Sequence, residues 1–207
     1  MRSKRILKRT LDIAGAVFLL IVFAPLLLAI AALIRLTMGA PIFFRQVRPG
    51  LHDRPFTLVK FRTMPVARDQ TLSIPVEGNL PWAGRLLRLT SLDELPELFH
   101  VLRGDMSLVG PRPLLTEYLS FYQPEHLRRH HMPPGITGLA QVNGRQTLKF
   151  SKRLELDVWY VDHWSLWLDL RILLKTAFSV FRRHEISDPA ELAGVDDLGL
   201  CRAMKIK

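Results

Sequence analysis

The longest hydrophobic segment lies near the start of the chain, where the 22 residues 13–34 contain no charged side chain. This length falls within the roughly 17–25 residues that a helix needs to cross a bilayer. Pro25 lies near the middle of the segment, and proline removes a helical hydrogen bond, which favours a kink. The pattern therefore predicts a membrane-inserted helix that bends near Pro25.

Basic residues flank this segment on both sides. They are Arg2, Lys4, Arg5, Lys8 and Arg9 before it, and Arg35, Arg45 and Arg48 after it. Because Lys and Arg favour the cytoplasmic side of a membrane, a re-entrant helix that returns to the same face satisfies both flanks. A simple spanning anchor is the competing interpretation. A signal peptide fits less well, since its apolar region usually has roughly 7–15 residues.

Two short segments after the apolar helix read as strands. Residues 42–48 and 56–62 are separated by a Pro-Gly turn, which predicts a β-hairpin. Lys60 and Arg62 share one face of the second strand because side chains alternate along a strand. Two cations at this spacing can converge on one anion, and the alternative is a solvated strand face.

Two adjacent carboxylates, Asp93 and Glu94, occur where the next helix is expected to begin. We expect this helix over residues 93–102 with Asp93 as its N-cap, because Pro96 is then the third helical residue and its missing N–H removes no intrahelical bond. A capping box between Ser91 and Glu94 is the alternative. In both cases the carboxylates meet the positive end of the helix, where capping alone contributes roughly 0.5–2 kcal/mol.

Arginines surround this carboxylate pair in the sequence. Arg85 and Arg88 precede it. Arg112 lies between two prolines that stiffen the backbone, so its guanidinium is aimed in advance at a phosphate. An Asn-Gly turn presents Arg145. Carboxylates beside guanidinium groups can hold a phosphate and a metal ion, with one carboxylate acting as a nucleophile on phosphorus.

Residues 151–183 combine a helical pattern with aromatic side chains. Trp159, Tyr160, Trp164 and Trp167 precede a leucine-rich segment. Trp and Tyr favour membrane interfaces, which predicts a helix that lies on the membrane. A helix packed in the core of the domain accounts for the same period.

Composition limits the partners of the chain. Its 207 residues carry a formal net charge of +10, and 48% of them are hydrophobic. Such a charge indicates anionic partners, namely nucleic acid, anionic lipid headgroups or phosphorylated substrates. The basic residues are scattered and no nucleic-acid-binding motif occurs, so we expect no nucleic acid partner. The single cysteine, Cys201, excludes an intrachain disulfide.

Several ordered blocks of sequence resemble one protein family. They are residues 84–96 (GRLLRLTSLDELP), 104–113 (GDMSLVGPRP), 60–64 (KFRTM), 134–138 (PGITG) and 141–145 (QVNGR). Together they closely resemble the bacterial sugar transferase family over about residues 8–187. These are the monotopic phosphoglycosyl transferases that start glycan assembly on polyprenyl phosphate. The chain is similar to the small form of the family, which lacks the extra spanning helices of larger relatives.

The resemblance implies a fold and a location. The fold is α+β and mainly helical, with an N-terminal re-entrant membrane helix, a small β-hairpin, a catalytic helix and interfacial amphipathic helices. The membrane-inserted helix with its basic N-terminus is expected at residues 1–37, a cytoplasmic catalytic domain at 38–187 and a C-terminal tail at 188–207. The expected location is the cytoplasmic face of the bacterial inner membrane, in contact with membrane lipids.

The resemblance also implies an activity. A sugar 1-phosphate passes from a UDP-sugar to polyprenyl (undecaprenyl) phosphate through a covalent aspartyl-phosphosugar intermediate, and UMP is released. This is the first membrane step of glycoconjugate or exopolysaccharide synthesis. Asp93 and Glu94 are the expected catalytic residues and the expected ligands of a Mg²⁺ cofactor. The expected phosphate-binding residues are Lys60, Arg62, Arg85, Arg88, Arg112 and Arg145.

Alternatives to this activity stay open. One is the same reaction through a ternary complex, with Asp93 acting only as a metal ligand, and another is a non-enzymatic basic membrane-anchored binding protein. The oligomeric state also stays open, with a homodimer as one option. The chain departs from the family's usual pattern at Asp53, Glu97 and His100, where glycine, glutamine and asparagine are usual, and it lacks the common terminal block.

Overall fold

A computed structural model describes residues 2–64, 81–144, 147–181 and 195–199 of the chain. It confirms the mainly helical α+β class. The α-helices are α1 (Arg2–Thr37), α2 (Trp82–Thr90), α3 (Leu98–Arg103), α4 (Pro124–Leu127), α5 (Leu139–Val142), α6 (Phe150–Asp162) and α7 (Leu166–Phe181). The 3₁₀ helices are η1 (Leu51–Asp53), η3 (Leu92–Glu97), η4 (Thr116–Phe121) and η5 (Arg128–His131). The strands are β1 (Phe43–Pro49), β2 (Pro55–Phe61), β3 (Ser107–Val109) and β4 (Gly135–Thr137).

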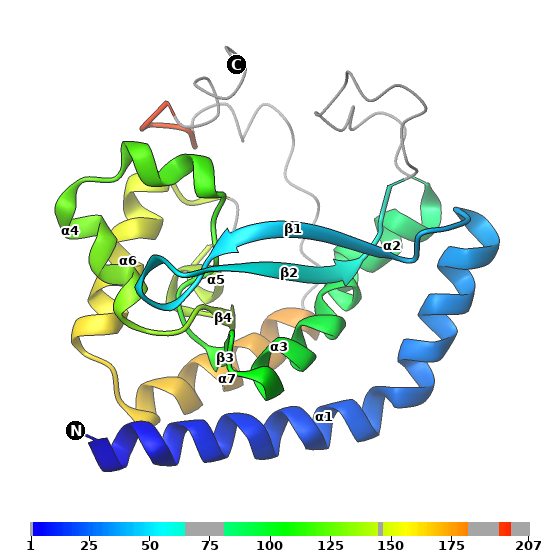
Figure 1. Ribbon diagram of the computed structural model, residues 1–207, viewed down its shortest axis with the longest axis horizontal. Helices are drawn as coiled ribbons and strands as arrows, with labels where there is room; N and C mark the ends of the chain where they lie inside the picture. The colour runs from blue at the N-terminus through cyan, green and yellow to red at the C-terminus, as the bar shows by residue number, and fades with distance from the viewer. Residues whose placement is uncertain (1, 65–80, 145–146, 182–194, 200–207) are drawn as a thin grey trace.

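Helix α1 is the longest element, with 36 residues and Pro25 inside it. Its N-terminal part runs along the base of the molecule, and Figure 1 shows it turning sharply upward before the chain enters β1. The missing N–H of Pro25 and the clash of its ring with the preceding turn account for a bend in this helix. The predicted kink is therefore confirmed, and α1 is long and apolar enough to cross a membrane.

Polar contacts fasten the N-terminal part of α1 to the domain. The Lys8 Nζ donates to Asp169 Oδ2 at 2.7 Å and to the Val109 carbonyl oxygen at 3.0 Å. The Asp12 carboxylate accepts from Ser107 Oγ at 2.7 Å and from the Leu108 backbone N–H at 3.1 Å. Lys8 and Asp12 are both buried, so these contacts lie in an environment where charges need such partners.

The other end of α1 contacts the same domain. The guanidinium of Arg62, at the end of β2, donates to the carbonyl oxygens of Met38 at 2.7 Å and Gly39 at 2.8 Å. These carbonyls follow the last turn of α1, where helical partners are missing. Ile34 is also fully buried, in a cluster with Phe61.

The predicted β-hairpin is confirmed, with boundaries shifted by about one residue. β1 and β2 pair antiparallel, with Phe44 opposite Lys60. The connection contains η1, in which Asp53 has a positive φ of 60°. Glycine adopts this conformation easily, whereas Asp53 holds it while accepting a hydrogen bond from His130 Nδ1 at 2.5 Å. β3 and β4 form a second, parallel pair.

The core lies between α1, the hairpin and α3. One buried cluster contains Ala16, Leu58, Leu98, Val101 and Met106, contributed by α1, β2, α3 and the segment that precedes β3. A second cluster joins the far end of α1 to β2 and α2. This packing fixes the segment between α2 and α3 against the hairpin, and that segment carries the two adjacent carboxylates.

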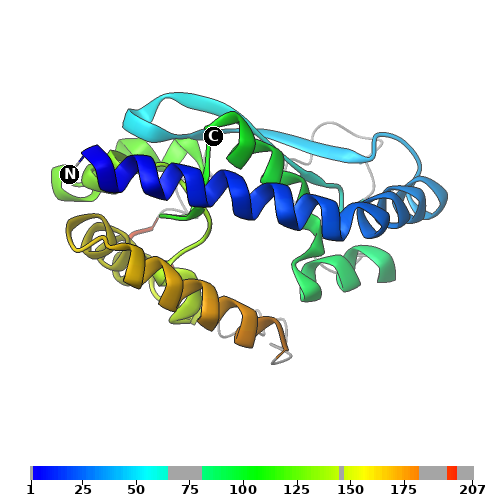
Figure 2. The same ribbon diagram turned by 90° about the horizontal axis from the view of Figure 1, so that it is seen from below.

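The aromatic segment forms two helices, α6 and α7, instead of one continuous helix. Tyr160 and Ile172 are buried, while Trp167, Leu174 and Phe178 are exposed. α7 therefore packs in the core through one side, as the core-helix interpretation predicts, and it exposes apolar side chains on the other side. Seen from below, α7 lies beside α1 and on the same side of the molecule as α2 (Figure 2).

Most of the C-terminal tail at 188–207 lies outside the described residues. Within residues 195–199, Val195 is buried in a cluster with Tyr118 and Phe150. The Val195 carbonyl oxygen accepts a hydrogen bond from the Phe150 backbone N–H at 3.0 Å. This part of the tail therefore packs at the start of α6.

Candidate active site

The carboxylate pair lies in a 3₁₀ helix, which corrects the prediction of an α-helix over residues 93–102. α2 ends at a left-handed Ser91 (φ 56°), η3 follows, and only then does α3 begin. No side chain caps η3, so the predicted Asp93 N-cap and the alternative Ser91–Glu94 capping box are both wrong. The reversed backbone at Ser91 and the proline at position 96 favour a short, tight helix over an α-helix that begins at Asp93.

Glu94 is held by two cations. Arg112 Nη2 donates to Glu94 Oε1, and Arg112 Nη1 lies 3.4 Å from Oε2, so the guanidinium meets both carboxylate oxygens. Lys60 Nζ lies 3.5 Å from Glu94 Oε1 and 3.8 Å from Glu97 Oε1. The structure thus brings together Lys60, Arg112 and the acid pair from β2, the loop after β3 and η3.

Burial and charge set the ionisation of these acids. Asp93 is only 8% exposed, and burial together with the charge of Glu94 raises the pKa of Asp93 to about 6. At pH 7 a group with this pKa is about nine-tenths ionised. Burial would raise the pKa of Glu94, but Arg112 and Lys60 outweigh it and hold that pKa low. Burial and Glu94 raise the pKa of Glu97.

The backbone of Arg112 is held in place by a buried ion pair that lies behind it. The guanidinium of Arg129, 1% exposed, donates to the Arg112 carbonyl oxygen at 2.5 Å. Arg129 is itself paired with the buried carboxylate of Asp157 at 2.6 Å. Sequence reasoning missed this support, because the basic run at residues 128–131 has no pattern that separates the buried arginine from its exposed neighbour.

Within the part of the chain that the structure describes, the other predicted phosphate-binding residues form no side-chain hydrogen bond or ion pair with the acid pair. Arg85 and Arg88 are exposed on α2, and Arg88 Nε donates to Thr63 Oγ1 at 3.0 Å. Arg62 does not join Lys60 at one anion site, because its guanidinium is bound to the carbonyls after α1. Arg145 lies outside the described residues.

A close approach of backbones fixes α2 beside the strand that carries Lys60. A Cβ on Gly84 would lie 1.9 Å from the Thr63 carbonyl oxygen, so only glycine fits there. This contact brings the exposed arginines of α2 to the end of β2. The glycine therefore serves the site through helix packing.

His100 and Glu97 are both buried at this site. His100 Nε2 accepts a hydrogen bond from the Val59 backbone N–H at 3.1 Å, and its Nδ1 lies 3.0 Å from Asp105 Oδ2. His100 therefore fastens α3 to β2. Glu97 shares Lys60 with Glu94 and adds a third acid beside the pair.

The side chains that could hold a metal ion at this site are the carboxylates of Asp93 and Glu94. Among the described residues, no group of three or more His, Cys, Asp or Glu side chains is arranged to hold a metal. Mg²⁺ is commonly bound through one or two carboxylates together with substrate phosphates. Asp93 and Glu94 are two adjacent carboxylates of this kind, and a Mg²⁺ ion bound to them would share Glu94 with Arg112 and Lys60.

Comparison with known proteins identifies the class. The bacterial sugar transferase family matches residues 3–183, so the chain belongs to that family and is a phosphoglycosyl transferase. It is 54% identical over 176 residues to "Uncharacterized sugar transferase EpsL" of Bacillus subtilis, covering 84% of this chain and 87% of the relative. It is 44% identical over 184 residues to a UDP-glucose:undecaprenyl-phosphate glucose-1-phosphate transferase of Caulobacter vibrioides, covering 84% of this chain and 69% of that relative.

Another relative, which is longer than this chain, is named for a different sugar. The chain is 39% identical over 200 residues to an undecaprenyl-phosphate galactose phosphotransferase of Salmonella typhimurium, covering 88% of this chain and 42% of the relative. The sequence-based family prediction is thus confirmed, and the alternative of a non-enzymatic binding protein is set aside. The relatives named for a sugar differ in that sugar.

Proposed function

We propose that this protein transfers a sugar 1-phosphate from a UDP-sugar to undecaprenyl phosphate and releases UMP. Relatives that cover most of the chain carry this activity in their names, with glucose or galactose as the sugar. The observation that carries the proposal is the pairing of Glu94 with Arg112 and Lys60 directly beside Asp93. This arrangement collects the charges that a diphosphate substrate requires.

In the proposed mechanism Asp93 is the nucleophile. Its carboxylate oxygen forms a bond to the sugar-bearing phosphorus, and the bond from that phosphorus to the bridging oxygen breaks, so UMP leaves with the electron pair. A phosphate oxygen of undecaprenyl phosphate then attacks the same phosphorus and displaces the Asp93 carboxylate. Two displacements return the enzyme to its starting form.

The neighbouring side chains are proposed to stabilise charge, bind phosphate and hold the metal ion. Glu94 is paired with Arg112 and Lys60, whereas burial and the charge of Glu94 raise the pKa of Asp93 to about 6, which leaves Asp93 mostly ionised at pH 7. Arg112 and Lys60 offset the repulsion between the carboxylate and the incoming diphosphate. Arg85 and Arg88, exposed on α2, are proposed to bind the outer phosphates. Asp93 and Glu94 would hold Mg²⁺, which supplies charge neutralisation on the diphosphate oxygens.

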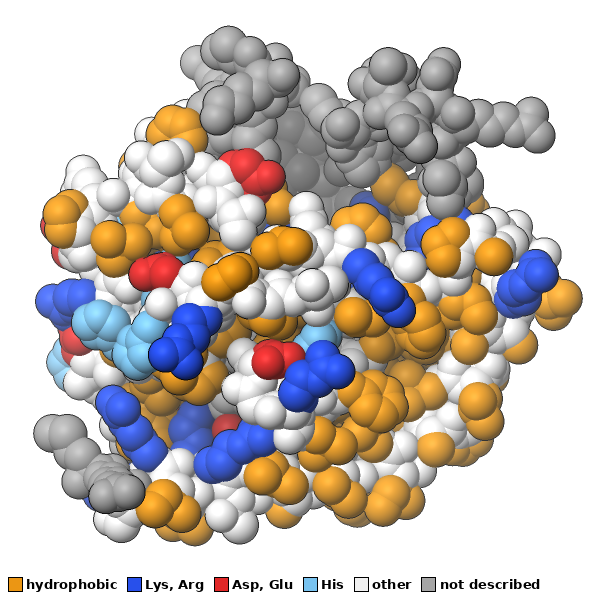
Figure 3. Space-filling view, viewed as in Figure 1, with side chains coloured by type: hydrophobic (Ala, Val, Ile, Leu, Met, Phe, Trp, Pro, Cys, Tyr) orange, Lys and Arg blue, Asp and Glu red, His pale blue; other side chains and the backbone are white. Residues whose placement is uncertain are grey.

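We further propose that α1 is re-entrant and that residues 38–187 form a cytoplasmic catalytic domain. Lys8 contacts Asp169 at one end of α1, and Arg62 binds the carbonyls after the other end, so both ends rest on one domain. A helix with both ends on one domain and a bend inside it enters and leaves a bilayer on the same side. The exposed apolar side chains over the lower and right-hand edges in Figure 3 fit this placement.

Helices α2 and α7 are proposed to lie in the membrane interface. The exposed apolar residues of α7 include Trp167, Leu170 and Phe178, and those of α2 include Trp82 and Leu86. In Figure 2 both helices lie on the side of α1 opposite the hairpin. This placement lets a lipid-linked phosphate reach the acid pair while the nucleotide sugar enters from the aqueous side.

A screen of UDP-sugars tests the function. Purified protein with Mg²⁺ and undecaprenyl phosphate is expected to release UMP with one UDP-sugar and to form a lipid-linked sugar diphosphate. Initial rates at varied concentrations of both substrates separate the ternary-complex alternative, since the two-step scheme gives parallel double-reciprocal lines and a ternary complex gives intersecting ones. Absence of UMP release with every UDP-sugar would contradict the proposed function.

A further inference from the structure

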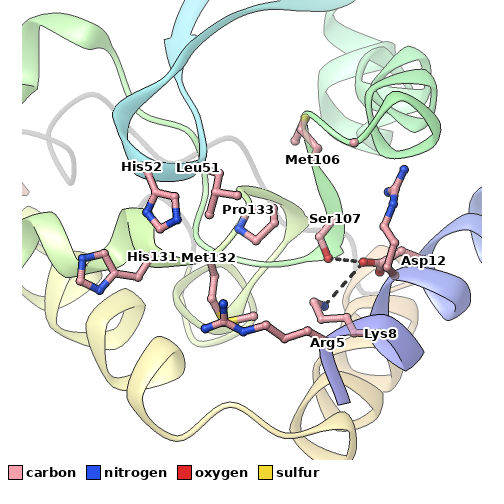
Figure 4. A pocket seen from close by; sticks show the side chains of 12 residues that line it. Arg5, Lys8, Asp12, Leu51, His52, Met106, Ser107, His131, Met132 and Pro133 are labelled. Carbon is pink, nitrogen blue, oxygen red and sulfur yellow. Dashed lines mark hydrogen bonds and ion pairs between the residues drawn. The ribbon is translucent and has the colours of Figure 1, made fainter. Parts of the chain in front are cut away.

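We propose that this protein has a second phosphate site, away from the acid pair, which takes the phosphate of a membrane lipid. The site is a cavity of about 160 Å³ between the N-terminal part of α1, the tip of the hairpin and the segment after η5. Figure 4 shows it from close by, with apolar side chains around its centre. Those side chains are Leu51, Met106, Met132 and Pro133.

Most of the charge in the cavity wall is already neutralised by the protein. Lys8 pairs with Asp169, and Asp12 accepts hydrogen bonds from Ser107 and Leu108. Arg9 donates to the carbonyl oxygens of Val101 at 2.5 Å and Leu102 at 2.9 Å, at the end of α3. These groups build the wall and hold α1 in place, so they do not need an external anion.

Three donors remain. Arg5, His52 and His131 line the cavity and are exposed, and among the described residues none of them forms a hydrogen bond or an ion pair. The rings of His52 and His131 lie 6.0 Å apart, and the Arg5 side chain extends toward the same side of the cavity (Figure 4). A guanidinium and two imidazoles around an apolar hollow form a binding site for a phosphate that carries an apolar group.

The backbone brings His52 to this position. His52 and Asp53 have positive φ values of 53° and 60°, which side chains other than glycine rarely adopt. The bond from His130 Nδ1 to Asp53 Oδ1, 2.5 Å long, ties the hairpin tip to η5. Because His52 adjoins Asp53 and His131 adjoins His130, this bond sets the two exposed imidazoles side by side.

The surroundings of the cavity indicate a lipid as the source of the phosphate. Ile6, Leu7 and Leu11 are exposed on the same stretch of α1 that supplies Arg5 to the cavity. In Figure 3, basic and histidine side chains gather at the lower left, next to the apolar base of the molecule. A lipid whose chains lie along α1 would therefore bring its headgroup phosphate to this cavity.

This site is not the place where the sugar phosphate reacts. Lys60 lies five residues beyond Pro55, at the end of β2 remote from the hairpin tip. At roughly 3.3 Å per residue the two ends of the strand are about 17 Å apart. A phosphate between Arg5 and His52 is thus too far away to accept a sugar phosphate from Asp93, and the site goes beyond the proposed function.

Binding of a short-chain lipid tests the proposal. The full chain in neutral detergent is titrated with dioctanoyl phosphatidylglycerol, and in a separate experiment with inorganic phosphate. We expect saturable binding of the lipid, weakened about tenfold or more in the Arg5→Gln, His52→Gln double variant because charge-assisted donors to the phosphate are lost. The Lys152→Gln, His163→Gln variant removes one cation and one imidazole outside the cavity and is expected to bind like the wild type.

Two results of these titrations would overturn the proposal. Equal lipid affinity in wild type and the Arg5→Gln, His52→Gln variant would overturn the site. Inorganic phosphate that binds as tightly as the lipid would overturn the assignment to a membrane lipid and indicate a free anion. UMP release in the absence of added phosphatidylglycerol is measured in parallel, so a failed lipid titration is distinguished from a failed sugar transferase.

Discussion

The side chain of Arg129 donates a hydrogen bond of 2.5 Å to the backbone carbonyl oxygen of Arg112. Arg112 in turn meets both carboxylate oxygens of Glu94, beside Asp93. A fully buried guanidinium therefore holds the backbone of the arginine that organises the acid pair. This arrangement makes Arg129 a positioning residue, because it acts on the acid pair through Arg112.

Replacing Arg129 by lysine is expected to lower kcat for UMP release by about tenfold while the KM for the UDP-sugar changes little. Lysine keeps the positive charge but cannot donate simultaneously to the Arg112 carbonyl and to Asp157 with the planar geometry of arginine. Steady-state kinetics measures both parameters. Arg128→Lys, at the neighbouring exposed position, is the control and should leave both unchanged. A normal kcat in a folded Arg129→Lys variant would remove the positioning role.

The buried partner of Arg129 is expected to matter for stability. Asp157→Asn leaves the guanidinium without its compensating charge, which costs about 3–5 kcal/mol when one member of a buried pair is removed. Asp162→Asn removes the partner of Arg128 at the surface, where such a pair contributes roughly 0–1 kcal/mol. Chemical denaturation in detergent measures the free energy of unfolding of each variant relative to the wild type. Equal decreases in the free energy of unfolding for Asp157→Asn and Asp162→Asn would contradict the expectation that the buried ion pair stabilises the protein more than the surface pair.

Arg62 and Lys60 are expected to behave oppositely when replaced. Arg62→Gln removes a charged donor from partly buried carbonyls after α1, so it should lower stability by roughly 1–3 kcal/mol while the KM for the UDP-sugar stays normal. Lys60→Gln removes a cation from the acid pair and should lower activity instead. Thermal denaturation and UMP release separate the two effects. A raised KM in Arg62→Gln would restore its predicted role in phosphate binding.

The re-entrant topology of α1 is tested by chemical labelling. Cys201→Ser removes the only cysteine, and Ser3→Cys or Thr37→Cys then places one thiol at either end of α1. A membrane-impermeant maleimide added to the outside of spheroplasts is expected to label neither variant, while permeabilised cells label both. External labelling of Ser3→Cys alone would establish a straight span instead.

Features encoded by local pattern were predictable from the sequence. The apolar run with Pro25 predicted a bent helix, and two alternating segments with a Pro-Gly turn predicted the hairpin, because both depend on neighbouring residues. The acid pair and Arg112 were found through family motifs together with the stiffening effect of two prolines. The alternation of side chains along the second strand indicates Lys60 as a possible anion ligand, and the structure places Lys60 beside Glu94.

Features that depend on distant contacts were not predictable. The left-handed conformation of Ser91 turned an expected α-helix into a 3₁₀ helix. The distinction between Lys60 and Arg62 depends on where α1 returns to the domain, since its terminal carbonyls take up the guanidinium. Arg129 sits in a run of four basic residues, and only the packing of α6 identifies it as the buried one.

The measurement that tests the central claim most directly is mass spectrometry of protein incubated with its UDP-sugar and Mg²⁺ without a lipid acceptor. We predict a sugar phosphate bound to the peptide that contains Asp93, lost when undecaprenyl phosphate is added. Asp93→Asn, a nearly isosteric change, should carry no adduct and should not turn over. Unmodified wild-type protein under these conditions, or rapid turnover by Asp93→Asn, would contradict the account.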